Sequence, residues 1–394
     1  MTDLCPIVVS KQDRSELEIG LALSGGGMRA AVFHLGVLGR LAASDALERV
    51  TFVSTVSGGS LGTGLVYTLS GNSWPSSATY SQTVLPEARR LITTVDIQRA
   101  AVTGLLRRPW RLISPGRWAN VLSEVLQRRW SVEGVMKNLP ETPRWIVNAT
   151  SYETGKNWRF TRHRMGDYEF GYVSNPPVPI ADAIAASAGF PLLIGFLSLD
   201  TADYSWWRFE DGSTSVTRPH NPKRRRVHLW DGGVYDNLGV EALFKVGKGL
   251  RQGYNFLVVS DASTALDIGK RYRIVQQARR LLSIAMDQVR SLRTRTIFDH
   301  FGRDPRSGVY LLMAKTVREA LSEARVPEDV IERVVSGCMP DEEARVAARF
   351  STTLQKMSER EFDLIYRHGW EVADCNLRAH RPDLFAAVPS EQRP

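Results

Sequence analysis

The stretch "LEIGLALSGGGMRAAVFHLGVLGRLAAS", residues 17–44, predicts a strand, a glycine turn and a helix in succession. Residues 17–24 are an apolar run typical of a buried strand. Residues 28–44 carry apolar side chains at helical spacing. The junction holds three consecutive glycines: Gly25, Gly26 and Gly27. A strand that passes into a helix through so tight a turn is typical of the start of a parallel α/β sheet.

The next segment repeats the pattern. Residues 49–56, "RVTFVSTV", predict a second strand, and the helix-like residues 61–69 follow it after "SGGS". Three further strands are predicted at residues 144–150, 226–233 and 254–262. We therefore expect an α/β fold with three layers, α/β/α, around a central, mainly parallel sheet.

The remaining segments predict one domain over residues 1–394, with its core at about 18–262. Residues 201–226 are rich in turn residues and charge, which indicates a loop or hairpin insertion. A helical part is expected at about 265–380. Within it, residues 265–301 predict a basic amphipathic helix, whose apolar stripe we expect to face the core rather than a membrane or partner. The stripe consists of Ile274, Ala278, Leu281, Ala285, Val289 and Leu292.

Composition favours a globular, cytoplasmic protein. The chain has 394 residues, is 43% hydrophobic and has no apolar run that approaches the roughly 18 residues of a membrane span. Its N-terminus lacks the hydrophobic stretch of a secretory signal. Cys5, Cys338 and Cys375 are odd in number and have no metal-ligand spacing, so we expect neither disulfides nor zinc, and no other metal or cofactor.

A formal net charge of +9 favours an anionic partner. Basic clusters occur at residues 105–118, 223–228 and 270–280, and the first contains tryptophans that suit a lipid interface. We expect a peripheral contact with an anionic membrane surface and no nucleic acid. Solvated basic faces with ordinary packed tryptophans are the alternative explanation.

The letters "GGSLG", residues 58–62, fit the pattern G-x-S-x-G with Ser60 at its centre. They lie after a predicted strand and before a predicted helix, where a sharp turn exposes a serine hydroxyl at a helix N-terminus. The placement predicts that Ser60 is a nucleophile.

The three glycines of residues 25–27 permit two interpretations. With Ala30 they satisfy the dinucleotide pattern G-x-G-x-x-A, but the acidic residue required at the tip of the second strand is missing. Their backbone N–H groups can instead stabilise the oxyanion of an acyl-transfer intermediate. We favour an oxyanion hole formed by Gly25, Gly26 and Gly27.

A nucleophilic serine needs a base, and Asp231 in "LWDGG" is the best candidate. It ends an apolar strand, and the two glycines after it let the chain turn away. Asp211, in the polar insertion, and Asp236 are the competing carboxylates.

In this order, "GGGMRA", "GGSLG" and "DGG" resemble the patatin-like phospholipases. Residues 186–191, "ASAGFP", and 148–160 resemble further parts of that family, and the resemblance extends from about Glu18 to beyond Asp374. It implies a Ser-Asp dyad without a catalytic histidine, with Ser60 as nucleophile and Asp231 as base, acting on fatty acyl esters of lipids.

The resemblance also implies that Gly25, Gly26 and Gly27 form the oxyanion loop, and that Arg29 positions this loop or an anionic head group. Many members have Asp before the glycines and Gly after the basic residue, whereas this chain has Ser24 and Ala30. That version is closer to the eukaryotic cytosolic phospholipases.

Two other functions remain open from the sequence. An ordinary α/β-hydrolase esterase would need a histidine after the acid, for which His300, His368 and His380 are available. The other is a catalytically inactive, basic membrane-binding protein. Such a protein would have no chemical need for the serine, the aspartate and the glycine loop together, so their joint presence speaks against it.

Overall fold

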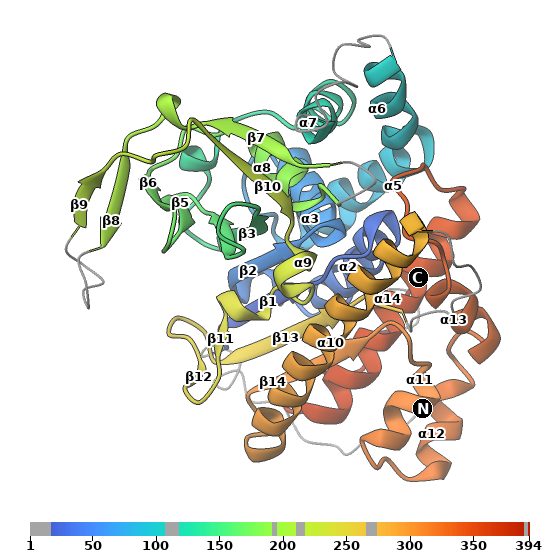
Figure 1. Cartoon of the computed structure of the whole chain (residues 1–394). Helices are drawn as coiled ribbons and strands as arrows, with labels where there is room; N and C mark the ends of the chain where they lie inside the picture. Colours follow the sequence, from blue (N-terminus) through green and yellow to red (C-terminus); the bar gives the residue numbers. More distant parts are fainter. Residues whose placement is uncertain (1–16, 107–117, 191–194, 210–216, 265–273, 390–392) are drawn as a thin grey trace.

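The computed structural model describes residues 17–106, 118–190, 195–209, 217–264, 274–389 and 393–394. A sheet of twelve strands runs through the molecule, and its centre is parallel (Figure 1). The parallel centre has the order β14 (Gly308–Leu312), β13 (Phe256–Asp261), β1 (Ile19–Leu23), β2 (Val50–Val56) and β3 (Arg144–Ser151).

Antiparallel strands extend the sheet beyond β3. They are β4 (Asn157–Phe160), β5 (Arg164–Asp167), β6 (Gly171–Ser174), β8 (Trp206–Phe209) and β9 (Thr217–His220). A branch pairs β10 (Arg226–Asp231) with both β3 and β7 (Leu197–Asp200). The short strands β11 (Phe244–Lys245) and β12 (Gly249–Leu250) form a separate hairpin.

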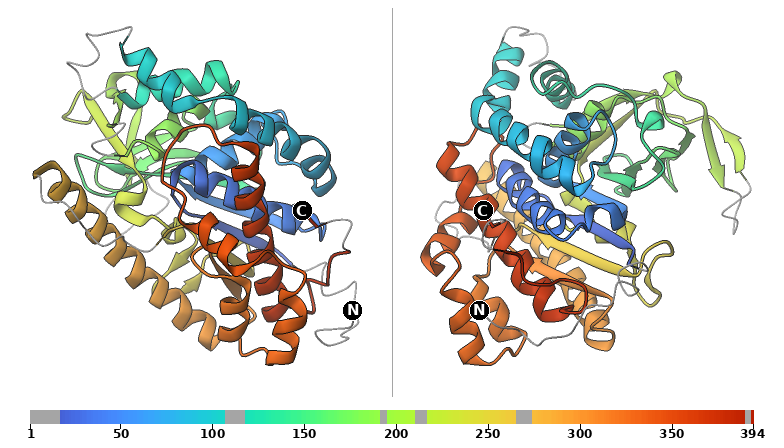
Figure 2. Two further views of the ribbon diagram at one scale, coloured as in Figure 1. Left: turned by 90° about the vertical axis from the view of Figure 1, so that its right-hand side faces the viewer. Right: turned by 180° about the vertical axis from the view of Figure 1, so that it is seen from behind.

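Helices cover both faces of the parallel centre (Figure 2). One face carries α2 (Gly27–Ala42), α3 (Gly58–Leu69), α5 (Leu85–Thr94), α8 (Ile180–Ser187) and α14 (Glu359–His380). The other carries α9 (Gly233–Asp236) and α10 (Ile274–Arg303). The remaining α-helices are α4 (Ser77–Thr79), α6 (Ile97–Leu106), α7 (Trp118–Arg129), α11 (Val317–Glu323), α12 (Glu328–Val335) and α13 (Asp341–Ala348). Short 3-10 turns lie at Leu47–Arg49, Met136–Asn138, Thr201–Asp203 and Val240–Ala242, and a π-helical turn at Tyr80–Val84.

The two layers of helices have separate hydrophobic cores because side chains alternate along each strand. On β1, Leu21 and Leu23 pack into the larger core beneath α2 and α14, while Ala22 packs into the smaller one. On β13, Val258 packs into the larger core and Val259 into the smaller one. Both faces of the central strands are therefore buried, which explains their continuous apolar sequences.

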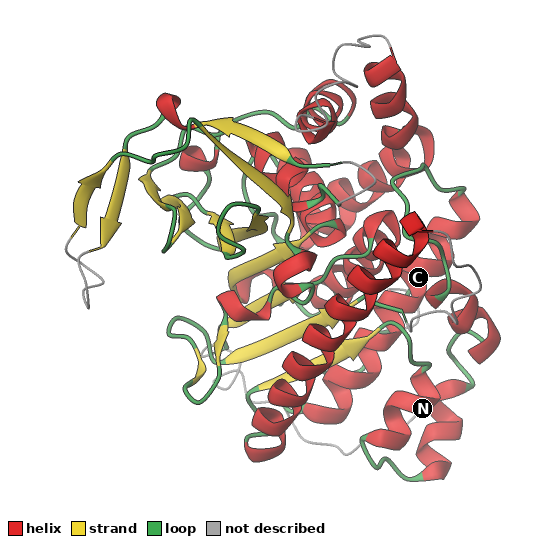
Figure 3. Ribbon diagram, viewed as in Figure 1, coloured by secondary structure: helices red, strands yellow, loops and turns green. Residues whose placement is uncertain are grey.

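The predicted architecture is confirmed. The five predicted strands are β1, β2, β3, β10 and β13, and the helix expected at 28–44 is α2. The insertion at 201–226 contains the antiparallel hairpin of β8 and β9, with residues 210–216 outside the described part of the chain. The sequence patterns did not predict β14 or the short strands β4 to β7, which Figure 3 shows in yellow among the helices.

Two predicted details were wrong. Helix α3 begins at Gly58, three residues before the expected start at 61. The apolar stripe of α10 faces away from the core, since Ala278 and Ala285 are exposed and the side chains of Leu281 and Leu292 are 69% and 60% exposed. Other side chains hold the helix to the protein. Ile297 is fully buried, and Arg290 donates a hydrogen bond to Asp261 at the end of β13.

Within the described residues, no helix combines the length and the apolar character needed to cross a bilayer.

Candidate active site

The glycine turn between β1 and α2 presents backbone donors at the C-terminal edge of the sheet. Gly26 and Gly27 have φ angles of +146° and +62°, which favour glycine. The N–H of Gly25 donates to the carbonyl oxygen of Asn237 at 3.0 Å. Within the described part of the chain, the N–H groups of Gly26 and Gly27 have no acceptor. Two of the three predicted oxyanion donors are thus available, whereas that of Gly25 is occupied.

The turn between β2 and α3 places Ser57 beside this loop. Ser57 is the first residue after β2 and has φ +50° and ψ −113°, a backbone conformation that costs free energy in a residue with a Cβ. The next residue, Gly58, lies so close to the loop that an added Cβ would be 2.1 Å from the carbonyl oxygen of Gly27. Glycine at 58 therefore lets the two turns touch. The N–H of Gly58 is in the first turn of α3 and also has no acceptor among the described residues.

Asp231 ends β10 and completes the cluster from the other side. Asp231 is 3% exposed, and its carboxylate accepts a hydrogen bond from the N–H of Gly233 at 2.7 Å. Burial raises the pKa of Asp231 from 3.8 to about 6, and interactions with the Gly233 N–H and the Ser57 side chain oppose that rise. The result is a buried carboxylate that is ionised at neutral pH and contacts a serine hydroxyl.

A cavity of about 590 Å³ opens onto this cluster. Ser57, Asp231 and the glycine turn form its floor. Its apolar lining comes mainly from α6, α7 and the turn after α8 and includes Ala101, Val102, Leu105, Leu122, Ala188 and Phe190. Its polar lining includes Asn237, Ser263, Ser283, Asp287 and Arg290, with Met286 among them. The cavity therefore suits a ligand with one apolar and one polar part.

The structure does not place Ser60 in this cavity. Because α3 begins at Gly58, Ser60 lies in the first helical turn with its side chain directed into the protein. Its side chain is fully buried, and its hydroxyl lies 2.8 Å from those of both Thr55 and Ser187. The Ser60 hydroxyl does not contact Asp231. The geometry thus contradicts Ser60 as the nucleophile and makes Ser57 the candidate.

Ser57 could have been recognised from the strand boundary. A nucleophile turn places its serine directly after the strand, and Ser57 follows "TFVSTV" at once, whereas Ser60 is three residues further on. The five-letter pattern G-x-S-x-G selected Ser60 because the chain has Thr55, not glycine, two residues before Ser57.

Arg29 lies in the cavity wall but is held by the protein. Its guanidinium donates to the carbonyl oxygens of Phe350 and Ala262, the latter at 3.1 Å. Burial lowers the pKa of Arg29 to about 10, and the negative charge of Asp261 opposes this change. Arg29 therefore anchors the first turn of α2, and with it the glycine turn, to neighbouring loops.

The competing carboxylates do not join the cluster. Asp236 is buried, accepts hydrogen bonds from the N–H groups of Leu238 and Glu241, and pairs with Arg293. Asp211 lies outside the described residues.

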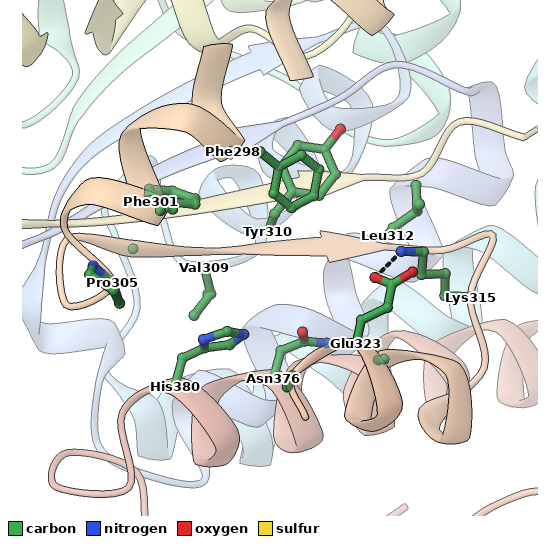
Figure 4. Close-up of a pocket in the computed structure, with 14 residues that line it drawn as sticks. Phe298, Phe301, Pro305, Val309, Tyr310, Leu312, Lys315, Glu323, Asn376 and His380 are labelled. Carbon is green, nitrogen blue, oxygen red and sulfur yellow. Dashed lines mark hydrogen bonds and ion pairs between the residues drawn. The ribbon is translucent and has the colours of Figure 1, made fainter. Parts of the chain in front are cut away.

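The candidate histidines also lie away from Ser57 and Asp231. The buried His368 ring interacts with the carbonyl oxygen of Met313 at 2.7 Å, and His300 packs against Phe244. His380 lines a separate cavity of about 330 Å³ between β14 and the helices α10, α11 and α14 (Figure 4). That cavity contains none of the predicted site residues.

Comparisons with known proteins found a matching family and solved structures of similar fold. Residues 21–244 match the model of the family described as patatin-like phospholipase. No curated protein sequence matches the chain.

Solved structures show the same fold. Human GIVD cytosolic phospholipase A2 aligns with a TM-score of 0.52 at 12% identity, over 96% of this chain and 64% of that one. The complex of that enzyme with methyl gamma-linolenyl fluorophosphonate aligns with a TM-score of 0.51 at 15% identity, over 96% and 60%. The present chain thus spans less than two thirds of the length of the human enzyme. The matched segment contains the end of β1, the glycine turn, Ser57 and Asp231, and it covers more than half of the sequence. The chain belongs to the patatin-like phospholipase family.

Proposed function

We propose that this protein is a lipid acyl hydrolase in which Ser57 is the nucleophile and Asp231 its base. The observation that carries the proposal is the contact between the Ser57 hydroxyl and the buried Asp231 carboxylate on the floor of an amphipathic cavity. Family membership supports hydrolysis of lipids in general terms.

The reaction can be written from the residues at the cavity floor. Asp231 accepts the proton of Ser57 as Oγ attacks the ester carbonyl carbon, and the N–H groups of Gly26, Gly27 and Gly58 stabilise the oxyanion. The C–O bond to the alcohol breaks, and protonated Asp231 gives its proton to the leaving oxygen. Water, deprotonated by Asp231, then attacks the acyl-serine. The fatty acid leaves and the proton returns to Ser57.

The environment of Asp231 suits the role of base. A carboxylate with an ordinary pKa is a poor acceptor for a hydroxyl proton, and burial makes Asp231 more basic. An acyl chain that fills the cavity would displace water and strengthen this effect. With a pKa of about 6, Asp231 is mainly ionised at neutral pH in the free protein, so the base is in its active form.

The division of the cavity lining supports a lipid ester as substrate. The side chains of Leu105, Leu122 and Phe190 would contact the acyl chain. The polar lining, with Asn237 and Arg290, would contact the head group. The ester bond would then lie between them, over Ser57.

We further propose that the cavity rim docks on an anionic membrane surface. Both α6 and α10 line the cavity, and both expose large apolar side chains beside it. Val102 and Leu106 on α6 are 50% and 65% exposed, and Leu281 and Ile284 on α10 are 69% and 39% exposed. Together with the net charge of +9, these side chains favour the interface of a negatively charged bilayer.

Turnover of esters tests the enzymatic proposal. We expect the wild type to release fatty acid from mixed phospholipid vesicles and to hydrolyse a chromogenic short-chain ester. Ser57→Ala and Asp231→Asn should each lower both rates by about 10⁴-fold. Equal rates from the three proteins would instead favour the inactive membrane-binding protein.

Vesicle sedimentation tests the docking proposal. Binding should require anionic lipid and weaken with salt, because screening acts on the electrostatic part of the interaction. Leu281→Asp should weaken binding by at least about 10-fold. Val346→Asp, at a position that is 45% exposed on α13, is the matched control and should bind normally. Equal binding to zwitterionic vesicles at all salt concentrations would refute the anionic preference.

A further inference from the structure

The turn that follows α8 lies between the two strand ends that carry Ser57 and Asp231. This turn, residues 187–190, comes from the "ASAGFP" segment. Ser187, the last residue of α8, is fully buried. Its Oγ accepts a hydrogen bond from the N–H of Ser57 at 2.9 Å. Ser57 has a positive φ angle, so this contact holds the backbone at the strained position of the turn.

The same turn also holds the strand end of Asp231 through its backbone. The N–H of Asp231 donates to the carbonyl oxygen of Gly189 at 3.1 Å, and the N–H of Gly232 donates to that of Ser187 at 3.2 Å. Ser57 and Asp231 lie 174 residues apart in sequence (231 − 57 = 174) on strands that do not pair directly. A single short turn thus contacts both of them.

A chain of buried hydroxyls supports Ser187 from the side opposite to the cavity. The Ser187 hydroxyl lies 2.8 Å from that of Ser60, which lies 2.8 Å from that of Thr55. The indole N–H of Trp145 donates to Thr55 Oγ1 at 3.0 Å and closes the chain. Trp145 is itself fixed by stacking on Tyr67, with ring centroids 4.8 Å apart. The serine at position 60 thus has a structural partner at each side and no access to the cavity.

We propose that Ser187 is a positioning residue that keeps the Ser57 hydroxyl aligned with Asp231, and that Ser60 and Thr55 support it. The proposal rests on the Ser57 and Asp231 assignment above. Without Ser187 Oγ, the buried N–H of Ser57 loses its acceptor, so the strained turn can relax and carry the hydroxyl away from Asp231. Binding of the lipid in the cavity would be unaffected, since Ser187 does not line it.

The test compares Ser187→Ala and Ser187→Cys with the wild type. Alanine is smaller than serine and cysteine somewhat larger, and neither replaces the hydroxyl as a strong acceptor, so a shared effect of the two variants reports the hydrogen bond rather than packing. Both variants should lower kcat, and the rate constant for phosphonylation of Ser57 by an alkyl fluorophosphonate, by about 10- to 100-fold with KM within about twofold of wild type. Ser77→Ala removes a buried serine that bonds Glu48 far from the cavity, and it should leave all these values unchanged.

The pH profile separates positioning from a general loss of stability. The interaction with the Ser57 side chain lowers the pKa of Asp231, so its loss raises this pKa and moves the acidic limb of kcat/KM to higher pH. The proposal would be overturned if both Ser187 variants had the kcat and the labelling rate of the wild type. It would also be overturned if the acidic limb of their kcat/KM profiles did not shift. If wild-type Ser57 is not labelled and Ser57→Ala remains active, the dyad assignment itself fails, which is a different result.

Discussion

The side chain of Ser57 interacts with the buried carboxylate of Asp231, where the end of β2 meets the end of β10. The two residues line the same cavity as Gly26 and Gly27, whose N–H groups have no acceptor among the described residues. The proposed nucleophile, base and oxyanion donors therefore meet at one edge of the sheet. The following predictions depend on this arrangement.

A serine-directed fluorophosphonate should modify Ser57 and not Ser60. Ser57 lines the cavity, whereas the Ser60 hydroxyl is fully buried between Thr55 and Ser187. Fragmentation mass spectrometry of the labelled peptide locates the adduct. Ser60→Ala should remain labelled, at a rate reduced by no more than about 100-fold. An adduct on Ser60 would restore the assignment made from the G-x-S-x-G pattern.

The rate of ester hydrolysis should depend on the ionisation of Asp231. Because the base must be deprotonated and burial raises its pKa to about 6, kcat/KM should rise with pH and reach half of its plateau near pH 6. A short-chain ester of pH-independent reactivity allows this profile to be measured. A half-point near pH 4 would show that Asp231 is not desolvated in the free enzyme.

Replacement of Asp231 by asparagine should stabilise the fold while abolishing activity. The pKa of Asp231 is about 6 in the folded protein and has its ordinary value of 3.8 in the unfolded chain, so the folded state binds the carboxyl proton more tightly. The folded protein therefore loses stability as the pH rises from about 4 to 6. At pH 8, Asp231→Asn should therefore unfold with a free energy up to about 3 kcal/mol higher than wild type. The difference should disappear below pH 4.

Urea denaturation at several pH values measures this difference. Asp304→Asn, at an exposed position, is the control and should unfold like the wild type at every pH. A destabilised Asp231→Asn variant at pH 8 would mean that hydrogen bonds to the carboxylate outweigh its desolvation.

Gly27→Ala should impair catalysis through the oxyanion donors. Gly27 has φ +62°, and an added Cβ would lie 2.6 Å from the carbonyl oxygen of Thr353, so the turn must shift. We expect kcat to fall by about 10²- to 10³-fold. Gly302→Ala is the matched control, because an added Cβ there has nothing within 4 Å. Unchanged kcat in Gly27→Ala would exclude this turn as the oxyanion hole.

Loss of the late histidines should have little effect on turnover. His300→Ala, His380→Ala and His368→Gln should each retain kcat within about threefold of wild type, because the three rings lie away from Ser57. The side-chain amide introduced by His368→Gln can still donate to the carbonyl oxygen of Met313. A loss comparable to that of Ser57→Ala in any of them would favour a Ser-His-Asp mechanism.

The local sequence determined the architecture and brought part of the candidate site together. Apolar runs and glycine turns marked β1, β2, β3, β10 and β13, because parallel strands buried on both faces must be continuously apolar. The carboxyl ends of such strands meet at one edge, so the glycine turn and Asp231 could be placed at the same site from sequence. The antiparallel strands β4 to β7 are short, and half-buried segments of four residues give a weak periodic signal.

Tertiary structure decided which serine faces the cavity and which face of α10 is exposed. Ser57 and Ser60 are three residues apart, and only the start of α3 at Gly58, set by its close approach to Gly27, puts one in the cavity and the other in the core. The amphipathic pattern of α10 is the same whether its apolar stripe meets a core or solvent. This helix contacts the protein through other side chains, which include Ile297, Arg290 and Thr294. Periodicity identifies the faces of a helix, but the contacts made by distant segments decide which face is buried.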